Sequence, residues 1–260
     1  MVTIRADDAG VRLGRHAAVR GVTLDMPPGQ LVGIIGPNGA GKSSLIRAML
    51  GLVPLSGGRV TINDSDVSAM SRRDIARQVA YLPQGQTLHW PLAVERLVAL
   101  GRLPHLGPLS RLTPADEALV DAALARADVL HLKGRVATEL SGGERARVLL
   151  ARALAVGARA LIADEPLASL DPGHQIDVME LLRAEAASGA LVVTVLHDLG
   201  MAARYCDRLI LMDRGELVAD GPPLDVLTRA HLARVYGVDV WIGEEAGRPV
   251  ILPLSRIPRS

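Results

Sequence analysis

The nine residues "GPNGAGKSS", Gly36 to Ser44, form the most informative stretch of this sequence. They fit the pattern G-x-x-x-x-G-K-[ST], in which glycines let successive backbone N–H groups converge on phosphate oxygens. The lysine adds a positive charge against the β- and γ-phosphates, and the serine hydroxyl suits Mg²⁺. A glycine-rich turn without a ligand needs neither group. We therefore predict a nucleotide phosphate site formed by Gly36, Pro37, Asn38, Gly39, Ala40, Gly41, Lys42, Ser43 and Ser44.

The flanks of this loop provide the context that such a site requires. The apolar run 31–35 predicts a buried strand before the loop, and "KSSLIRAMLGL" predicts a helix after it, whose N-terminal dipole favours anions. Similar apolar runs recur at 161–163, 191–196 and 209–212, separated by helical patterns. This alternation predicts an α/β fold with a parallel sheet.

Shorter elements are expected near both ends of the chain. Before the loop, "VTIRA" and "VTLDM" indicate edge strands, and "RVTINDSDV" after it indicates another. The stretch "DRGELVADG" (213–221) predicts a tight hairpin. A second hairpin is expected where "VDVWI" and "PVILPL" flank "GEEAGR", after a short helix over 231–236.

Residues 84 to about 157 have a helical pattern. One predicted helix opens with Thr113 as its N-cap, Pro114 at the first position and Asp116 at the third. Its apolar residues are predicted to share one face: Leu119, Val120, Ala123, Leu124 and Ala127. This stretch indicates a helical subdomain inserted into the α/β core.

Polar groups follow two of the predicted strands. "ALIADEP" ends at Asp164 and Glu165, and "LVVTVLH" ends at His197. The carboxyl ends of parallel strands line one crevice, so these groups are expected beside the phosphate loop. There Asp164 suits a Mg²⁺ ligand, Glu165 a general base for the attacking water, and His197 a γ-phosphate contact. Each alone also fits a structural role, and kinases and nucleotide switches remain open.

Composition narrows the class of protein. With 260 residues, 49% of them apolar, the chain has room for one large domain with an insertion. Its net charge of +1 argues against a bulk nucleic-acid binder. The chain lacks a secretory signal and the roughly 18–20 apolar residues of a membrane span, so a cytoplasmic protein is expected. The single cysteine, Cys206, is expected to be a small buried hydrophobe.

The stretch "LSGGERARVLLARAL" separates the remaining alternatives. Ser141 and Glu144 have the S-x-x-E spacing of a capping box at a helix start. Gly142 and Gly143 beside that helix start expose more backbone donors to an anion than a cap requires. A kinase or switch has no use for this second anion-binding segment.

In the order GPNGAGKS, "YLPQ", LSGGE, "LIADEP", "SLD" and "VLHDL", the chain resembles the nucleotide-binding subunit of an ATP-binding cassette (ABC) protein over roughly residues 2–230. The resemblance implies a P-loop NTPase (RecA-like) α/β core with an N-terminal antiparallel β subdomain and an inserted helical subdomain. We expect residues 1–85 and 158–227 to form the core, residues 86–157 the helical subdomain, and residues 228–260 a C-terminal extension of helix and hairpin.

The resemblance also implies a site shared by two copies packed head to tail. Ser141, Gly142 and Gly143 would bind the γ-phosphate held by the opposite copy, and Asp171 in "SLD" would cross the interface. Asp171 also fits the N-cap of the helix that begins at Pro172. Gln84 would sense Mg²⁺ and water at the hinge to the helical subdomain. The implied cofactors are ATP and Mg²⁺, with catalysis by Glu165, His197 and Gln84 and metal contacts from Ser43, Gln84 and Asp164.

The chain departs from the family pattern at three points. The family usually places an aromatic residue near positions 12–14 to stack on adenine, and this chain has none there, which leaves Leu13 or Arg12 as weaker substitutes. Ala146 replaces the usual glutamine before Arg147, and Leu167 stands where threonine is common. None of these changes removes a residue that handles phosphate.

A cassette without membrane spans implies a separate permease, a place on the cytoplasmic face of the inner membrane, and an indirect link to a substrate-binding protein. Trp90 and Leu92 follow Gln84, where the family docks its permease, and each equally fits a buried core role. The stretch "AVERLVALGR" and the C-terminal tail resemble importer cassettes for iron–siderophore, haem and cobalamin. Zinc or manganese importers, exporters, and soluble ABC ATPases acting on nucleic acid or the ribosome remain alternatives.

Overall fold

The computed structural model describes residues 1–85, 88, 90–107 and 109–257. Its centre is a six-stranded sheet in which only the edge strand β10 runs antiparallel to its neighbour. The strand order across this sheet is β10 (Glu216–Gly221), β9 (Arg208–Asp213), β3 (Gln30–Ile35), β8 (Leu191–Val195), β7 (Ala160–Asp164) and β6 (Val79–Leu82). The parallel α/β core predicted from the apolar runs is confirmed.

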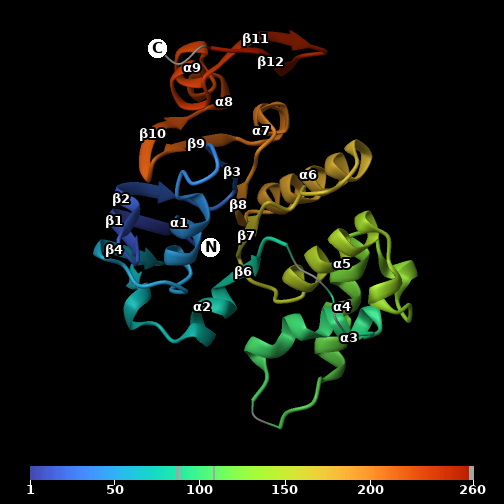
Figure 1. Cartoon of the computed structure of the whole chain (residues 1–260). Coiled ribbons are helices and arrows are strands. Elements are labelled where there is room, and N and C mark those ends of the chain that lie inside the picture. The colour runs from blue at the N-terminus through green and yellow to red at the C-terminus, as the bar shows by residue number, and fades with distance from the viewer. Residues whose placement is uncertain (86–87, 89, 108, 258–260) are drawn as a thin grey trace.

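A second sheet at the N-terminus is antiparallel throughout. It consists of β2 (His16–Met26), β1 (Ile4–Leu13), β4 (Gly57–Ile62) and β5 (Ser65–Asp66). Helix α1 (Lys42–Met49) lies between this sheet and the core, as Figure 1 shows in blue. The predicted N-terminal strands therefore exist, but β1 and β2 are about twice as long as the apolar runs indicated.

The core sheet is buried on both faces because its side chains alternate between two apolar clusters. In β3, Val32 and Ile34 pack with α1 and the N-terminal sheet, whereas Leu31 and Ile35 pack with the helices of the opposite face. Those helices are α5 (Gly142–Leu154), α6 (Pro172–Ala187) and α7 (Leu199–Tyr205). A strand that is buried on both faces has a continuous run of apolar residues, and such runs are what predicts these strands from the sequence.

The segment between β6 and β7 is helical and lies below the core sheet in Figure 1. It contains α3 (Val94–Ala99), α4 (Pro114–Arg126) and α5, with short 3-10 turns η2 (Leu100–His105), η3 (Leu130–Leu132) and η4 (Ala137–Glu139). The capping box predicted for α4 is present. The predicted apolar face of α4 is wrong at Leu119, which is 44% exposed. The other four residues of the predicted face are buried in the core: Val120, Ala123, Leu124 and Ala127.

A buried arginine joins three parts of this helical segment. Arg102 in η2 donates to Asp116 Oδ1 in α4 at 2.9 Å and to the carbonyl oxygens of Ala155 and Val156 at the end of α5. The hydroxyl and backbone N–H of Thr113, together with Arg102, lower the pKa of Asp116 to about 2. The guanidinium thus holds η2, α4 and α5 together.

The C-terminal part follows the hairpin of β9 and β10, which is confirmed with its turn at Arg214 and Gly215. It contains α8 (Pro223–Val226), α9 (Arg229–Tyr236), β11 (Val238–Glu245) and β12 (Arg248–Arg256). The second hairpin turns at Ala246 and Gly247, so part of the expected loop belongs to β11. The remaining elements are α2 (Arg72–Gln78) and η1 (Val67–Ala69).

Two further expectations can be compared with the structure. Cys206 is buried, and burial raises the pKa of its thiol to about 12, so it is a small buried hydrophobe as expected. Within the described ranges, no helix has the length and apolar character needed to cross a bilayer.

Candidate functional site

The phosphate loop joins β3 to α1 and depends on glycine at two positions. At Gly36 (φ +148°) an added Cβ would lie 2.2 Å from the carbonyl oxygen of Met212. At Gly41 (φ +97°), the N-cap of α1, it would lie 2.2 Å from the carbonyl oxygen of Ala18. Both approaches are closer than any side chain allows, so the loop takes this path only with glycine.

Lys42 lies inside the loop. Its Nζ donates to the carbonyl oxygens of Gly36, at 2.7 Å, and Pro37, at 3.0 Å, and the residue is buried. Burial lowers the pKa of Lys42, and the charges of Glu165 and Asp164 act in the opposite direction. The ammonium group is therefore held at the loop with two carboxylates close enough to favour its charged form.

Asp164 ends β7 and is almost fully buried, with 1% of its surface exposed. Its Oδ1 accepts a hydrogen bond from Ser43 Oγ at 3.2 Å, whereas Oδ2 is buried without a hydrogen-bond partner among the described residues. Burial raises the pKa of this carboxyl group, although the Ser43 hydrogen bond opposes the shift. A buried carboxylate with an unsatisfied oxygen beside a hydroxyl is a set of hard donors that fits a divalent cation.

Glu165 is held between two polar partners from neighbouring strands. Gln84, just after β6, donates from Nε2 to Glu165 Oε2 at 2.6 Å, and His197, after β8, places Nε2 2.7 Å from Oε1. Glu165 has φ +54°, in the left-handed region that is costly for a residue with a side chain. The carboxyl ends of β6, β7 and β8 thus bring three sequence-predicted residues into contact.

The loop, Gln84, Glu165 and His197 line one cavity of about 550 Å³, whereas Asp164 is among the described lining residues of another cavity that it shares with Glu165. The first cavity is lined by Leu13, His16, Ala18, residues 38–44, Gln84, Glu165 and His197. Leu13 lies in this wall, whereas Arg12 is not among its described lining residues. His16 was not identified from the sequence, although the pair Gly14-Arg15 signals a two-residue turn that sets position 16 opposite Leu13.

The signature segment lies outside this cavity. Ser141 caps α5 with its side chain, and the Ser141 N–H donates to Glu144 Oε2 at 2.8 Å, so the predicted capping box is present. The Ser141 backbone and hydroxyl hydrogen bonds lower the pKa of Glu144. Among the described residues, the cavity wall contains none of the four residues predicted to act on a partner's nucleotide: Ser141, Gly142, Gly143 and Asp171. Gly142 instead lines another cavity, together with Asp164 and Glu165 of the same chain.

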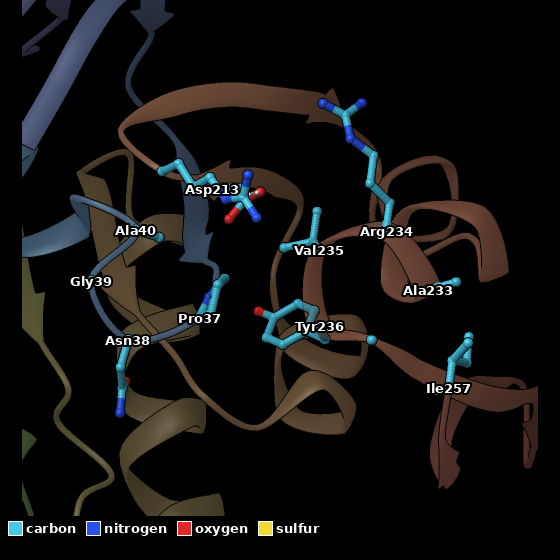
Figure 2. A pocket seen from close by; sticks show the side chains of 12 residues that line it. Pro37, Asn38, Gly39, Ala40, Asp213, Ala233, Arg234, Val235, Tyr236 and Ile257 are labelled. Atoms are coloured by element: carbon cyan, nitrogen blue, oxygen red, sulfur yellow. Dashed lines mark ion pairs between the residues drawn. The ribbon is translucent and has the colours of Figure 1, made fainter. Parts of the chain in front are cut away.

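A further cavity, of about 590 Å³, lies between the phosphate loop and the C-terminal segment (Figure 2). Figure 2 shows Tyr236, at the end of α9, with its hydroxyl directed toward Pro37. That hydroxyl is buried, and burial raises its pKa, whereas a backbone hydrogen bond with Gly36 opposes the shift. The wall on this side also carries Asp213 and Arg214, which form a long ion pair at 3.9 Å. The C-terminal segment thus reaches the loop on a side where neither Glu165 nor His197 lines the cavity.

Trp90 and Leu92 have different environments. Trp90 is 75% exposed, so the core interpretation of this residue is wrong. Leu92 is half-buried, and its backbone bonds to Trp90 and Ala137. Thr87 and His89, in the same predicted docking stretch, lie outside the described residues.

Residues 19–168 match the family model described as ABC transporter. The chain is 42% identical over 256 residues to the hemin import ATP-binding protein HmuV of Pseudomonas fluorescens, covering 96% of this chain and 99% of that protein. It is 46% identical over 239 residues to HmuV of Nocardia farcinica, covering 90% and 81% of the two chains.

Solved structures share the fold. A metal-chelate type ABC transporter in an inward-facing conformation superposes with a TM-score of 0.86 at 22% identity, covering 98% of both chains. The ADP conformation of an ATP-binding cassette of an ABC transporter superposes with a TM-score of 0.81 at 25% identity, covering 91% of this chain and 98% of that one. The first of these likenesses carries information on the fold alone.

Proposed function

This chain belongs to the ABC transporter family as an ATP-hydrolysing subunit, and we propose that the transporter it powers imports haem. The observation that carries the cargo proposal is the 42% identity, over nearly the whole of both chains, to a hemin import ATP-binding protein.

As an ABC transporter ATPase, the chain works in a complex with a permease. We place the complex at the inner membrane, with this chain bound at the cytoplasmic face.

ATP is proposed to occupy the cavity of about 550 Å³, with its phosphates on loop 36–44. Backbone N–H groups of the loop and the N-terminal dipole of α1 would bind the phosphate oxygens, and Lys42 would exchange its two carbonyl contacts for phosphate. Ser43, Asp164 and Gln84 would hold Mg²⁺. The ion, when bound, neutralises charge on the β- and γ-phosphates.

Glu165 is proposed as the general base. Its two carboxylate oxygens are oriented by Gln84 and His197, which fixes the direction in which the carboxylate can receive a proton from water. His197 is 44% exposed at the cavity, so it can turn from Glu165 toward a γ-phosphate oxygen. Movement of the helical segment would shift Gln84, because this residue lies at the start of the segment, just after β6.

The active form is proposed to be a head-to-tail pair of copies. Support comes from the position of Ser141 and Gly142, which are exposed and absent from the described wall of their own chain's ATP cavity. In the pair, the start of α5 and Asp171 of one copy would close the cavity of the other. Trp90, which is exposed and follows Gln84 by six residues in the sequence, is proposed as part of the surface that contacts the permease.

The proposal is tested by measuring ATP hydrolysis of the chain reconstituted with its permease in lipid vesicles. The substrate-binding protein is added empty, or loaded with haemin, a ferric siderophore or cobalamin. We expect stimulation by the haemin-loaded form alone. Stimulation by another loaded form would replace haem with that cargo, and stimulation by none would refute import of this class while leaving the ATPase assignment intact.

A further inference from the structure

The two glycines of the signature segment have different surroundings. At Gly142 no heavy atom of the described chain lies within 4 Å of the position that a Cβ would take. At Gly143 the same position lies 1.5 Å from Cδ2 and 2.0 Å from Nε2 of His174. The imidazole of His174 therefore occupies the space that a side chain at Gly143 would need, and it does so within the same chain.

The opposite side of that imidazole contacts Asp171. His174 Nδ1 lies 3.0 Å from Asp171 Oδ1, and the backbone N–H of His174 donates to the same oxygen at 3.0 Å. These two hydrogen bonds lower the pKa of Asp171. The ring thus has Asp171, the N-cap of α6, on one edge and Gly143, in the first turn of α5, on the other.

This contact joins two parts of the fold. Helix α5 lies in the helical segment between β6 and β7, whereas α6 packs on the core strands β3 and β8. One turn farther along both helices, Arg147 forms an ion pair with Asp177 at 3.4 Å. The contacts of His174 with Gly143 and of Arg147 with Asp177 therefore connect α5 to α6. Any rotation of the helical segment against the core has to change these contacts.

We propose that His174 is a positioning residue, which ties Asp171 to Gly143 so that both reach the nucleotide of a partner copy as one preformed surface. The proposal rests on the two-copy site proposed above. His174 itself does not contact the reacting atoms. It acts by holding groups from two helices at a fixed separation, and small displacements of such groups can cost up to about 100-fold in rate.

The first test compares His174→Ala with the unchanged full-length chain. Because His174 is absent from the described wall of the ATP cavity, we expect ATP binding at low protein concentration to remain within about twofold. We expect kcat to fall roughly tenfold or more. In a Glu165→Gln background, which slows turnover, ATP-induced dimerisation measured by sedimentation should require a higher protein concentration. Glu180→Ala, an exposed change on the same helix, is the matched control and should leave both quantities unchanged.

A second variant separates the two contacts of the ring. His174→Asn keeps a donor near the position of Nδ1, and with it the bond to Asp171, but removes the ring edge from Gly143. If both contacts are needed, its kcat falls as in His174→Ala. Full activity of His174→Asn would show that the contact with Gly143 has no role, and would overturn the proposal.

A double-mutant cycle with Gly143→Ala provides a readout that loss of folding does not mimic. Gly143 is helical, so alanine there favours the helix, but its Cβ displaces His174. We expect the kcat losses of Gly143→Ala and His174→Ala to be non-multiplicative, the double variant being no slower than the slower single variant. Multiplicative losses would mean that the residues act independently, and would refute the link.

The outcomes distinguish this inference from the function on which it rests. If the Glu165→Gln chain with His174 intact does not dimerise with ATP, the two-copy site fails, and this inference fails with it. If that chain dimerises and His174→Ala dimerises equally well with unchanged kcat, only the positioning role is refuted.

Discussion

Replacement of Glu165 by glutamine tests the proposed base with the least change in shape. The carboxylate accepts from Gln84 at 2.6 Å and lies 2.7 Å from His197 Nε2, so an amide of the same size keeps one acceptor but can no longer receive a proton. A positioned general base contributes about 10²- to 10⁴-fold, so we expect kcat to fall by that factor, which is roughly 2.7–5.4 kcal/mol of transition-state stabilisation.

The same change should leave ATP binding intact or strengthen it. The charge of Glu165 opposes phosphate in the cavity, and it raises the pKa of both Lys42 and Asp164. Its removal therefore brings Asp164 closer to its ordinary pKa and reduces repulsion of the nucleotide.

The assay is single-turnover hydrolysis of radiolabelled ATP, with binding measured separately by calorimetry. Glu165→Asp is the informative companion, because the shorter side chain keeps its charge but cannot reach both Gln84 and His197. A Glu165→Gln rate within tenfold of the unchanged chain, at equal ATP occupancy, would refute the role of Glu165 as base. Loss of ATP binding in that variant would instead mean that Glu165 holds the loop.

Three further predictions address the loop, the helical segment and the exposed tryptophan. Gly41→Ala should abolish ATP binding and lower the melting temperature, because its Cβ would lie 2.2 Å from the Ala18 carbonyl oxygen at φ +97°; calorimetry that finds normal affinity would contradict this. Asp116, with a pKa of about 2 against the ordinary 3.8, contributes stability above about pH 4 that is lost as the pH falls toward 2, and Asp116→Asn should remove that part of the pH dependence of thermal unfolding. Trp90→Ala should change stability by less than about 0.5 kcal/mol, because the side chain is 75% exposed, yet weaken binding to the permease; a large drop in melting temperature would show a structural role instead.

The phosphate loop was readable in the sequence because its information is local. Gly36 and Gly41 allow the positive φ angles that this short loop needs. The strand before the loop and the helix after it are predicted by the residues immediately next to it in the sequence. The grouping of Asp164 and Glu165 with His197 was also predictable, because parallel strands end at one edge of a sheet.

Hydrophobic periodicity does not predict how wide the buried face of a helix is. Periodicity included Leu119 in the apolar face of α4, but Leu119 is exposed, whereas Val120, Ala123, Leu124 and Ala127 are buried. Hydrophobic spacing indicates the direction of a buried stripe, and the packing partners decide how far around the helix that stripe extends.

Sequence patterns predict the α/β class, the phosphate loop and the order of the ABC motifs, because each depends on residues adjacent in the chain or on a general rule of sheet topology. The folded structure was needed to show that His16 lines the proposed ATP cavity, that Trp90 is exposed, and that His174 lies against Gly143. The physical reason is distance along the chain. The contact between His174 of α6 and Gly143 of α5 depends on how these two helices pack together. The two residues are far apart in the sequence, so no local pattern predicts that they meet.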